Sequence, residues 1–250
     1  MNSVLRRAVL PDFVILLETP LEISMFRILA LETSELTGSV AAAEDGKVLA
    51  QLELDPQQRS AQSLAPAIRR LLKQVGWQPR NVQLLAVTIG PGSFTGLRVG
   101  VATAKVFAYA AGAEVLGINT LETIAAATPR AMAAVSVAVD AQRGDVIAQS
   151  FRRETTGGMI AVDERSLLPQ EEWLANVRPG FAISGPGLKK LANSLPAGVT
   201  MIDRAFWHPM AANVARLAYR DYQAGRRDDL WNLLPIYSRP SAAEEKWAKK

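Results

Sequence analysis

Cysteine is absent from the 250-residue chain, and histidine occurs once, at His208. A disulfide scaffold, a zinc site with Cys ligands and a thiol nucleophile are therefore excluded. Only His208 is available for a histidine metal site or a Ser-His pair. It directly precedes an expected helix, so the sequence favours a packing or helix-entry role. Carboxylates remain as general acids or ligands for hard metals.

Strong charge of either sign is also missing. The chain has 28 Lys and Arg against 24 Asp and Glu, a net charge of +4, and the basic residues are scattered. This excess is too small to predict nucleic-acid binding by itself, although it does not oppose membership of an RNA-containing assembly. Hydrophobic residues make up 49% of the sequence, enough for one large domain or two small ones with a real core.

A hydrophobic run long enough to span a bilayer is lacking near the start. Residues 1–24 contain Arg6 and Arg7 before an apolar run, but Pro11 and Asp12 interrupt it and no small-residue cleavage pattern follows. Met25 stands directly before a clean strand pattern. We therefore interpret residues 1–24 as a disordered extension or a mis-assigned start, and expect a cytoplasmic protein that does not enter the membrane.

The part after Met25 alternates strand and helix patterns. Three short β patterns, RILALET, GSVAAAE and KVLAQLEL, are separated by turn residues that include Asp45-Gly46, a strong hairpin signal. A helix is expected over 63–76, capped by Ser63 and closed by Gly76. A strand, the glycine loop of 90–96, a second helix and the strand EVLGIN follow.

The second half repeats this order with a hairpin around Arg143-Gly144, a helix near 170–175, the strand FAIS and a long helix of about 209–224. Two successive units predict a duplicated α/β domain with a cleft between its halves. We place the first lobe at 25–117, with the helix 209–224 as a candidate to pack back on it, and the second lobe at 118–208. Residues 225–250 are expected to form an extended, solvated tail.

The loop IGPGSFTGLRVG joins a strand to a helix start, a place where free N–H groups and the helix dipole favour an anion. The candidate anion-binding residues are Gly90, Gly92, Ser93, Thr95, Gly96 and Arg98. A P-loop requires Lys-Ser/Thr after its last glycine, whereas Leu97-Arg98 stands there, and a dinucleotide fingerprint requires glycine where Thr95 stands. Neither nucleotide motif is met.

The helix behind the loop carries a glycine or alanine at every fourth position from Gly96 to Gly112. Each glycine costs about 0.5–1 kcal/mol of helix stability relative to alanine, so close packing should compensate for it. The stripe is explained either by packing on the protein's own sheet or by the helix of a partner protein. The sequence alone leaves both open.

RILALETS, GPGSFTGLRVG, INTLE, VDAQRGDV and PIYSRP together resemble the bacterial TsaB (YeaZ) family over about 25–239. That family takes part in forming N6-threonylcarbamoyladenosine (t6A) in tRNA. The resemblance implies the two-lobed actin-like, sugar-kinase and Hsp70 ATPase fold (ASKHA, ribonuclease H-like).

A catalytic relative in the same superfold, TsaD, binds metal through two histidines of an Asn-His-Met-Glu-Gly-His segment. The matching segment here keeps Asn119 and Glu122 but has Thr120 and Ile124 at the histidine positions, so the chain resembles a non-catalytic paralogue. Two further departures weaken a claim of ATP hydrolysis: Glu32 replaces the usual first-strand Asp, and Ser60 stands where the family often has His.

The resemblance implies a scaffold subunit that pairs with TsaD, associates with the small ATPase TsaE, contacts tRNA only through the complex and forms a homodimer when alone. It requires no cofactor of its own, any metal lies on the partner, and weak ATP or ADP binding stays open. We expect the partner interface at Leu64, Ile68, Leu71, Leu97, Gly100, Val101, Ala104, Ala108 and Tyr109. Candidates for the inter-lobe cleft are Glu32, Thr33, Ser34, Asp140, Arg143, Gly185 and Gly187.

Two other functions stay open at this stage. An independent kinase or ATPase of the superfold would use the cleft as its active site, and saturable ATP binding with Mg²⁺-dependent turnover would identify it. A protease is disfavoured, because the chain has neither a His pair nor a His-containing triad around a G-x-S-x-G elbow.

Overall fold

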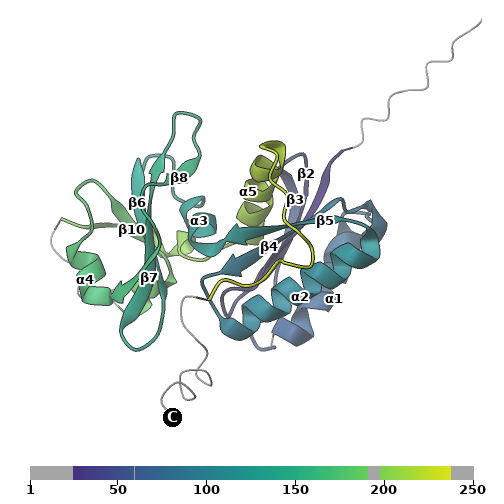
Figure 1. Ribbon diagram of the computed structural model, residues 1–250, viewed down its shortest axis with the longest axis horizontal. Coiled ribbons are helices and arrows are strands. Elements are labelled where there is room, and N and C mark those ends of the chain that lie inside the picture. The colour runs from purple at the N-terminus through teal and green to yellow at the C-terminus, as the bar shows by residue number, and fades with distance from the viewer. Residues whose placement is uncertain (1–24, 59, 191–197, 238–250) are drawn as a thin grey trace, which may run out of the picture.

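A computed structural model describes residues 25–58, 60–190 and 198–237 of the chain (Figure 1). The sequence also predicts a helix from Leu188. Its part beyond Lys190, residues 1–24 and the end of the tail, 238–250, lie outside the described residues. Within the described ranges, no helix is both long and apolar enough to cross a membrane.

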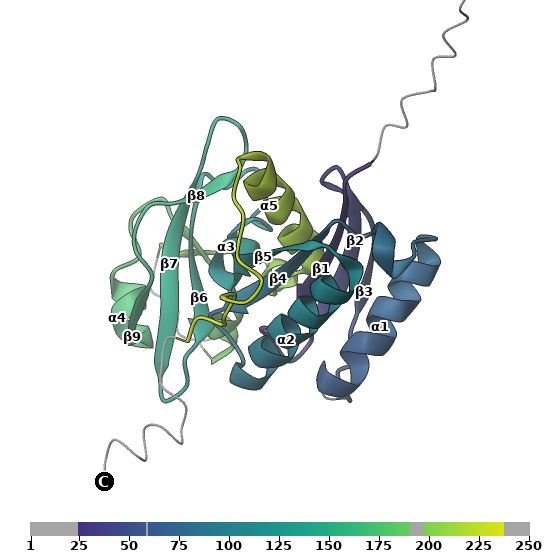
Figure 2. The ribbon, with the colours of Figure 1, turned by 45° about the vertical axis from the view of Figure 1, so that its right-hand side comes forward.

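The first sheet has five strands in the order β3-β2-β1-β4-β5. Strands β1 to β3 are antiparallel, whereas β1, β4 and β5 are parallel. The bounds are β1 Arg27–Glu32, β2 Ser39–Glu44, β3 Lys47–Glu53, β4 Leu84–Gly90 and β5 Glu114–Asn119. Helices α1 (Ser60–Gln74) and α2 (Phe94–Ala111) cover one face, and α5 (Ala211–Gln223) covers the other (Figure 2).

The second sheet repeats this plan in the order β11-β10-β6-β7-β8, with β9 also paired to β7. Again a hairpin, β6–β7, is antiparallel and the crossover strands β10 and β11 are parallel to β6. The bounds are β6 Ala134–Asp140, β7 Asp145–Arg153, β8 Met159–Ala161, β9 Ser166–Pro169, β10 Ala182–Ser184 and β11 Thr200–Met201. This repetition is the predicted duplicated two-lobed ASKHA plan.

Short helical elements complete the two halves: the 3₁₀ turn Pro79–Asn81 in the first, and α3 (Thr120–Ala125), α4 (Gln170–Ala175) and the 3₁₀ turns Pro186–Lys190 and Arg204–Phe206 in the second. Helix α3 follows the first sheet in the chain, yet Leu121 and Ile124 belong to the core of the second sheet. Helix α5 follows the second sheet, yet Val214 and Ala218 belong to the core of the first. The helix that covers one face of the first sheet therefore comes from the end of the chain.

Local sequence signals explain several element boundaries. Asp45 and Gly46 both have positive φ, at 47° and 77°, and form the predicted β2–β3 turn. Gly76, at φ 71°, closes helix α1, where the Trp77 N–H donates to the Leu72 carbonyl at 2.9 Å. The predicted cap at Ser63 is wrong, because α1 begins at Ser60 and Ser63 is buried inside the helix.

Residues 226–237, here called the C-terminal strap, lie across β5, β4 and α2 (Figure 1). The Gly117 N–H donates to Asp228 Oδ2 at 2.8 Å, and the Ile236 N–H donates to the Ile89 carbonyl at 2.7 Å. Leu233 is buried in the core beneath α1 and α2. The strap is extended and most of its residues are exposed, but it is held on the first lobe along β5 and β4, so the expectation of a tail free in solvent is wrong for these residues.

Candidate functional site

The glycine loop connects β4 to α2 at the carboxyl end of the parallel strands. Ser93 is the N-cap of α2, and its Oγ accepts a hydrogen bond from the Gly96 N–H at 3.2 Å. Of the two caps considered from the sequence, Ser93 or Thr95, the structure selects Ser93. The loop is therefore a helix start of the kind that often receives an anion.

On each loop glycine, however, the position that a Cβ atom would occupy is next to a carbonyl oxygen of the same chain. A Cβ atom at Gly90 would come within 2.6 Å of the Ile236 oxygen, and one at Gly92 or Gly96 would overlap the oxygens of Ser34 and Thr33. The Ser93 N–H already donates to the Ser34 carbonyl at 2.7 Å. Carbonyl oxygens repel an anion, so the space that these glycines create fits the β1–β2 turn and the strap better than it fits a phosphate.

Arg98 was the positive charge expected to contact a bound anion, but its side chain instead contacts two aromatic side chains. Its guanidinium carbon lies 3.8 Å from the ring centroid of Phe94, and its Nε donates to Tyr237 Oη at 2.9 Å. Phe94 and Tyr237 are themselves in contact, with centroids 4.7 Å apart. Cation–π contacts of this kind fix an arginine against the protein surface, so Arg98 ties the strap to the start of α2.

Glu32, at the end of β1, is completely buried. Its Oε1 accepts from the Ser34 N–H at 2.7 Å and from Ser34 Oγ at 2.5 Å, and Thr88 Oγ1 lies 3.4 Å away. Burial outweighs these hydrogen bonds and raises the pKa of Glu32 to about 8. The protonated form of the side chain therefore predominates at pH 7.

The adjacent cleft candidates serve the fold. Thr33 and Ser34 are buried beneath the glycine loop. Gly185 and Gly187 let the 3₁₀ turn after β10 approach β6, because a Cβ on either one would press on the Ala138 carbonyl oxygen. Asp140 Oδ1 accepts from the Gln142 N–H at 2.8 Å in the β6–β7 turn. Arg143, at φ 56°, lies exposed at the tip of that turn.

Glu35, which sequence reasoning missed, brings the two lobes together at this end. Its Oε2 lies 3.6 Å from Lys189 Nζ and 4.0 Å from His208 Nδ1. Burial raises the pKa of Glu35, opposed by Lys189, and burial lowers the pKa of His208 with help from Lys189 and Arg204. The sequence does show an acidic residue in the turn after a buried strand. It gives no sign of the partners of Glu35, because Lys189 and His208 follow it by more than 150 positions.

The segment matched to the metal-binding histidines of TsaD is structural in this chain. Asn119 caps α3 through its Oδ1, which accepts from the Leu121 N–H at 2.8 Å, and Glu122 pairs with Arg220 of α5 at 2.7 Å. Thr120 and Ile124 are buried, and Ile124 is part of the second core. In the part of the chain that the structure describes, no cluster of three or more His, Asp or Glu side chains could hold a metal ion.

The expected partner interface is mostly core. All of its residues except Tyr109 are buried, and those with larger side chains pack against the first sheet. Gly100 is needed because a Cβ there would overlap Thr33 Oγ1. The Gly/Ala stripe is thus explained by packing on the chain's own sheet, and the prediction of an interface at Leu64, Ile68, Leu71, Leu97, Gly100, Val101, Ala104 and Ala108 is wrong.

A different face of α2 is exposed and apolar. Val106 and Tyr109 are 70% and 69% exposed, and Trp231 and Leu234 of the strap are 66% and 67% exposed. Tyr109 and Trp231 are in contact, with ring centroids 5.7 Å apart. We call Ala102, Val106 and Tyr109 of α2, with Trp231 and Leu234 of the strap, the α2–strap face. Large apolar side chains gathered in this way are typical of protein interaction sites.

A family model described as TsaD, tRNA N6-adenosine threonylcarbamoyltransferase, matches residues 49–216. The chain is 28% identical over 226 residues to the tRNA threonylcarbamoyladenosine biosynthesis protein TsaB of Escherichia coli, covering 88% of this chain and 97% of that protein. Identity to the TsaB of Bacillus subtilis is 27% over 228 residues, with the same coverage of each chain.

Solved structures give the same relationship. The chain resembles YeaZ from Pseudomonas aeruginosa with a TM-score of 0.75 and 26% sequence identity. The superposition covers 85% of this chain and 100% of that one. The described lobes and their order are therefore those of a YeaZ structure.

Proposed function

Since the chain belongs to the tRNA N6-adenosine threonylcarbamoyltransferase (TsaD) family, on its TsaB (YeaZ) branch, we propose that it is the non-catalytic subunit of the t6A-forming transferase. In this role it supports a catalytic TsaD-related partner that attaches the threonylcarbamoyl group to adenosine 37 of tRNA.

The observation that carries this proposal is the buried state of Thr120 and Ile124. Metal ligands must present a lone pair to an open coordination site, and neither side chain does so. The contacts of the loop disfavour the alternative of an independent kinase or ATPase.

We propose the α2–strap face as the surface that receives the catalytic partner. It offers exposed aromatic and aliphatic side chains, and the neighbouring helix α1 carries the exposed basic residues Arg69, Arg70 and Lys73. A fitting partner would place an apolar helix here with acidic residues along one side. The same face would associate with a second copy of this chain when the partner is absent, and a TsaE-like ATPase would join the assembled pair.

Nucleoside mass spectrometry of total tRNA from cells depleted of the protein tests the proposal. We expect t6A to be lost and to be restored by the full chain and by a chain starting at Met25. A chain carrying Glu32→Gln should restore it as well, because a neutral side chain is already present at that position. Unchanged t6A after depletion would contradict the assignment, and failure of Glu32→Gln alone would return the cleft to consideration as an active site.

A further inference from the structure

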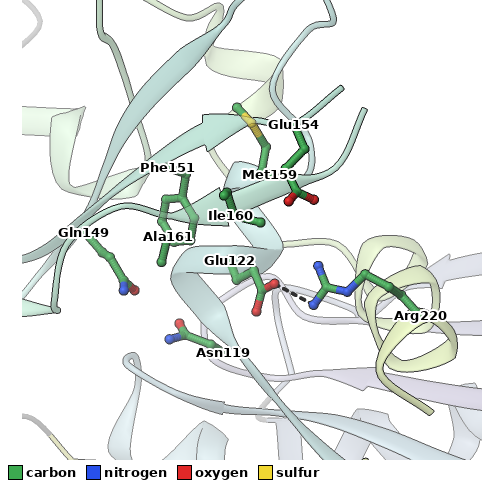
Figure 3. Close-up of a pocket in the computed structure, with 9 residues that line it drawn as sticks. All are labelled: Asn119, Glu122, Gln149, Phe151, Glu154, Met159, Ile160, Ala161 and Arg220. Carbon is green, nitrogen blue, oxygen red and sulfur yellow. Dashed lines mark hydrogen bonds and ion pairs between the residues drawn. The ribbon is translucent and has the colours of Figure 1, made fainter. Parts of the chain in front are cut away.

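A pocket of about 280 Å³ lies at the junction of the two lobes (Figure 3). Its walls come from α3, from the β7–β8 hairpin and from α5. Glu154 follows the end of β7, which runs antiparallel to β6, so it lies at the opposite end of the second sheet from Asp140. Arg220 likewise lies in the last turn of α5, whose first residue is bonded to Ser39 near the cleft. None of the residues that line the pocket belongs to the α2–strap face.

The pocket carries an uncompensated negative charge. Its two acids are Glu122 and Glu154, and its one cation is Arg220. Arg220 already donates through Nη2 to Glu122 at 2.7 Å, and its Nε donates to Asp221 Oδ1 at 2.8 Å. Among the described residues, the Glu154 carboxylate accepts one hydrogen bond, from the Thr156 hydroxyl at 3.3 Å, and has no cation within ion-pair distance.

A second acceptor without a donor lies on strand β7, across the pocket from Glu154 (Figure 3). Gln149 uses its Nε2 to donate to the Asp163 carbonyl at 3.0 Å, which leaves Oε1 buried without a hydrogen-bond partner in the described part of the chain. A buried acceptor of this kind costs about 1–3 kcal/mol when it stays unpaired. Gln149 Oε1 thus lacks a donor from the described chain, whereas Glu154 is exposed to solvent and available to pair with a cation.

The rest of the lining is apolar and faces this polar rim. Phe151 and Met159 are buried, and Ile160 is 44% exposed at the mouth (Figure 3). A wall of this type covers a methylene chain while its charged head remains among the acceptors. The volume lies just below the range of about 300–1,000 Å³ that is usual for drug-sized ligands, so it suits a stem of a few carbons rather than a nucleotide.

We propose that this pocket binds a primary ammonium group on an aliphatic stem, with the ammonium at Glu154 and the stem over Met159 and Ile160. An anion is disfavoured, because Glu122 and Glu154 would repel it and Arg220 is already shared between two carboxylates. Two sources carry this chemistry: a free polyamine, and the lysine side chain of another protein.

Binding is tested on the full chain by NMR titration with methyl-labelled Met and Ile residues. The probes are spermidine, blocked lysine (Nα-acetyl-lysine methylamide), and 1-butanol and butyrate as neutral and anionic controls. We expect both cations to shift the Met159 and Ile160 signals saturably, with weaker binding at higher salt, and neither control to do so. Tighter binding of spermidine would identify a free polyamine, and tighter binding of blocked lysine a protein side chain.

Glu154→Gln should weaken the binding of the better cation by roughly two- to fivefold, the usual size of an exposed charge interaction. Glu171→Gln, an exposed acid on α4 outside the pocket, should leave it unchanged. Both side chains are exposed, so neither change threatens folding. Equal binding by the Glu154 variant, or equal shifts with butanol, would overturn the proposal whether or not the protein acts in t6A formation.

Discussion

Glu32 is the single residue with the strongest expected influence on the pH response of the fold. The folded protein keeps the proton on Glu32 up to about pH 8, whereas an unfolded chain releases it near the ordinary value of 4.5. The unfolded state therefore gains relative stability as the pH rises through this window. We expect the free energy of unfolding to fall between about pH 5 and pH 8 and to level off above that range.

Glu32→Gln should remove most of this decline, since glutamine resembles the protonated acid. The gain at pH 9 relative to the wild type should be on the order of a few kcal/mol. Urea unfolding across the pH series measures it, with Glu171→Gln as the control for losing one exposed acid. A decline of the same steepness in the Glu32 variant would show that other groups cause it.

Leu233 and Leu234 are neighbours in the strap with opposite surroundings. Leu233 is 6% exposed in the core beneath α2, whereas Leu234 is 67% exposed. Leu233→Ala should lower the free energy of unfolding by about 2–5 kcal/mol, and Leu234→Ala should change it little. Chemical denaturation of the pair tests whether the strap is an integral part of the first lobe, and equal stability of the two variants would argue that it is not.

At the scale of elements, the contact of helix α2 with the end of β1 depends on two glycines that face different atoms. A Cβ at Gly96 would meet the Thr33 backbone oxygen, whereas one at Gly100 would meet the Thr33 side chain. Gly96→Ala and Gly100→Ala should each destabilise the protein by about 1–3 kcal/mol.

Thr33→Ala provides the discriminating control. It removes the side-chain oxygen opposite Gly100 and should recover part of the Gly100→Ala loss, but it leaves the backbone oxygen opposite Gly96 in place. Thermal unfolding of the single and double variants measures the difference. Equal recovery in both double variants would contradict the packing described for α2.

The outward side of α2 tests the proposed partner face. Val106→Asp should weaken binding to the catalytic partner roughly ten- to hundredfold, because a charge would replace an exposed apolar anchor. Leu167→Asp, a partly exposed leucine on β9 of the second lobe, should have little effect on binding. Co-purification and calorimetric titration measure both, and full affinity of the Val106 variant would rule out this side of α2.

The same helix shows what sequence reasoning can reach. The four-residue spacing from Gly96 to Ala108 correctly identified a face of minimal side chains, since spacing reports which residues share a face. It could not identify the element covering that face, because a sheet of the same chain and a helix of a partner impose the same requirement. The turn at Asp45-Gly46 was predictable because its backbone conformation depends on the residues themselves.

The position of the strap and the contacts of Glu35 could not be predicted from the sequence, for a related reason. Residues 226–237 have neither helical nor strand periodicity, and their position depends on the open edge of β5 and on single contacts such as the one between Lys105 Nζ and the Trp231 carbonyl at 2.8 Å. Glu35, Lys189 and His208 come together only when both lobes are assembled. Contacts of this range depend on the tertiary fold rather than on local sequence.

At the scale of the whole molecule, the repeat of strands and helices along the chain was predictable from the sequence. The repeated order of hairpin, helix and strand predicted two similar lobes, and the TsaB resemblance specified the fold. That α5 packs back on the first lobe was considered from the sequence, and α3 lies within the range assigned there to the second lobe.

Because α5 follows the second sheet in the chain but packs in the core of the first, the two lobes should unfold together. Calorimetry should show one transition whose calorimetric and van't Hoff enthalpies agree. Val214→Ala, a fully buried change on α5, should move that single transition to lower temperature without dividing it. Two resolved transitions in either protein would mean that the lobes are thermodynamically separate.

The position of α5 also has a consequence for the ribosome. Ile28, Ala30 and Leu84 form an apolar sheet face that is made early in synthesis, but the helix that covers it spans Ala211–Gln223. Translation at about 5–20 residues per second leaves this face waiting several seconds for its cover. The part of the protein that is synthesised first is thus completed last, and the nascent chain has the greatest need of chaperone protection during that interval.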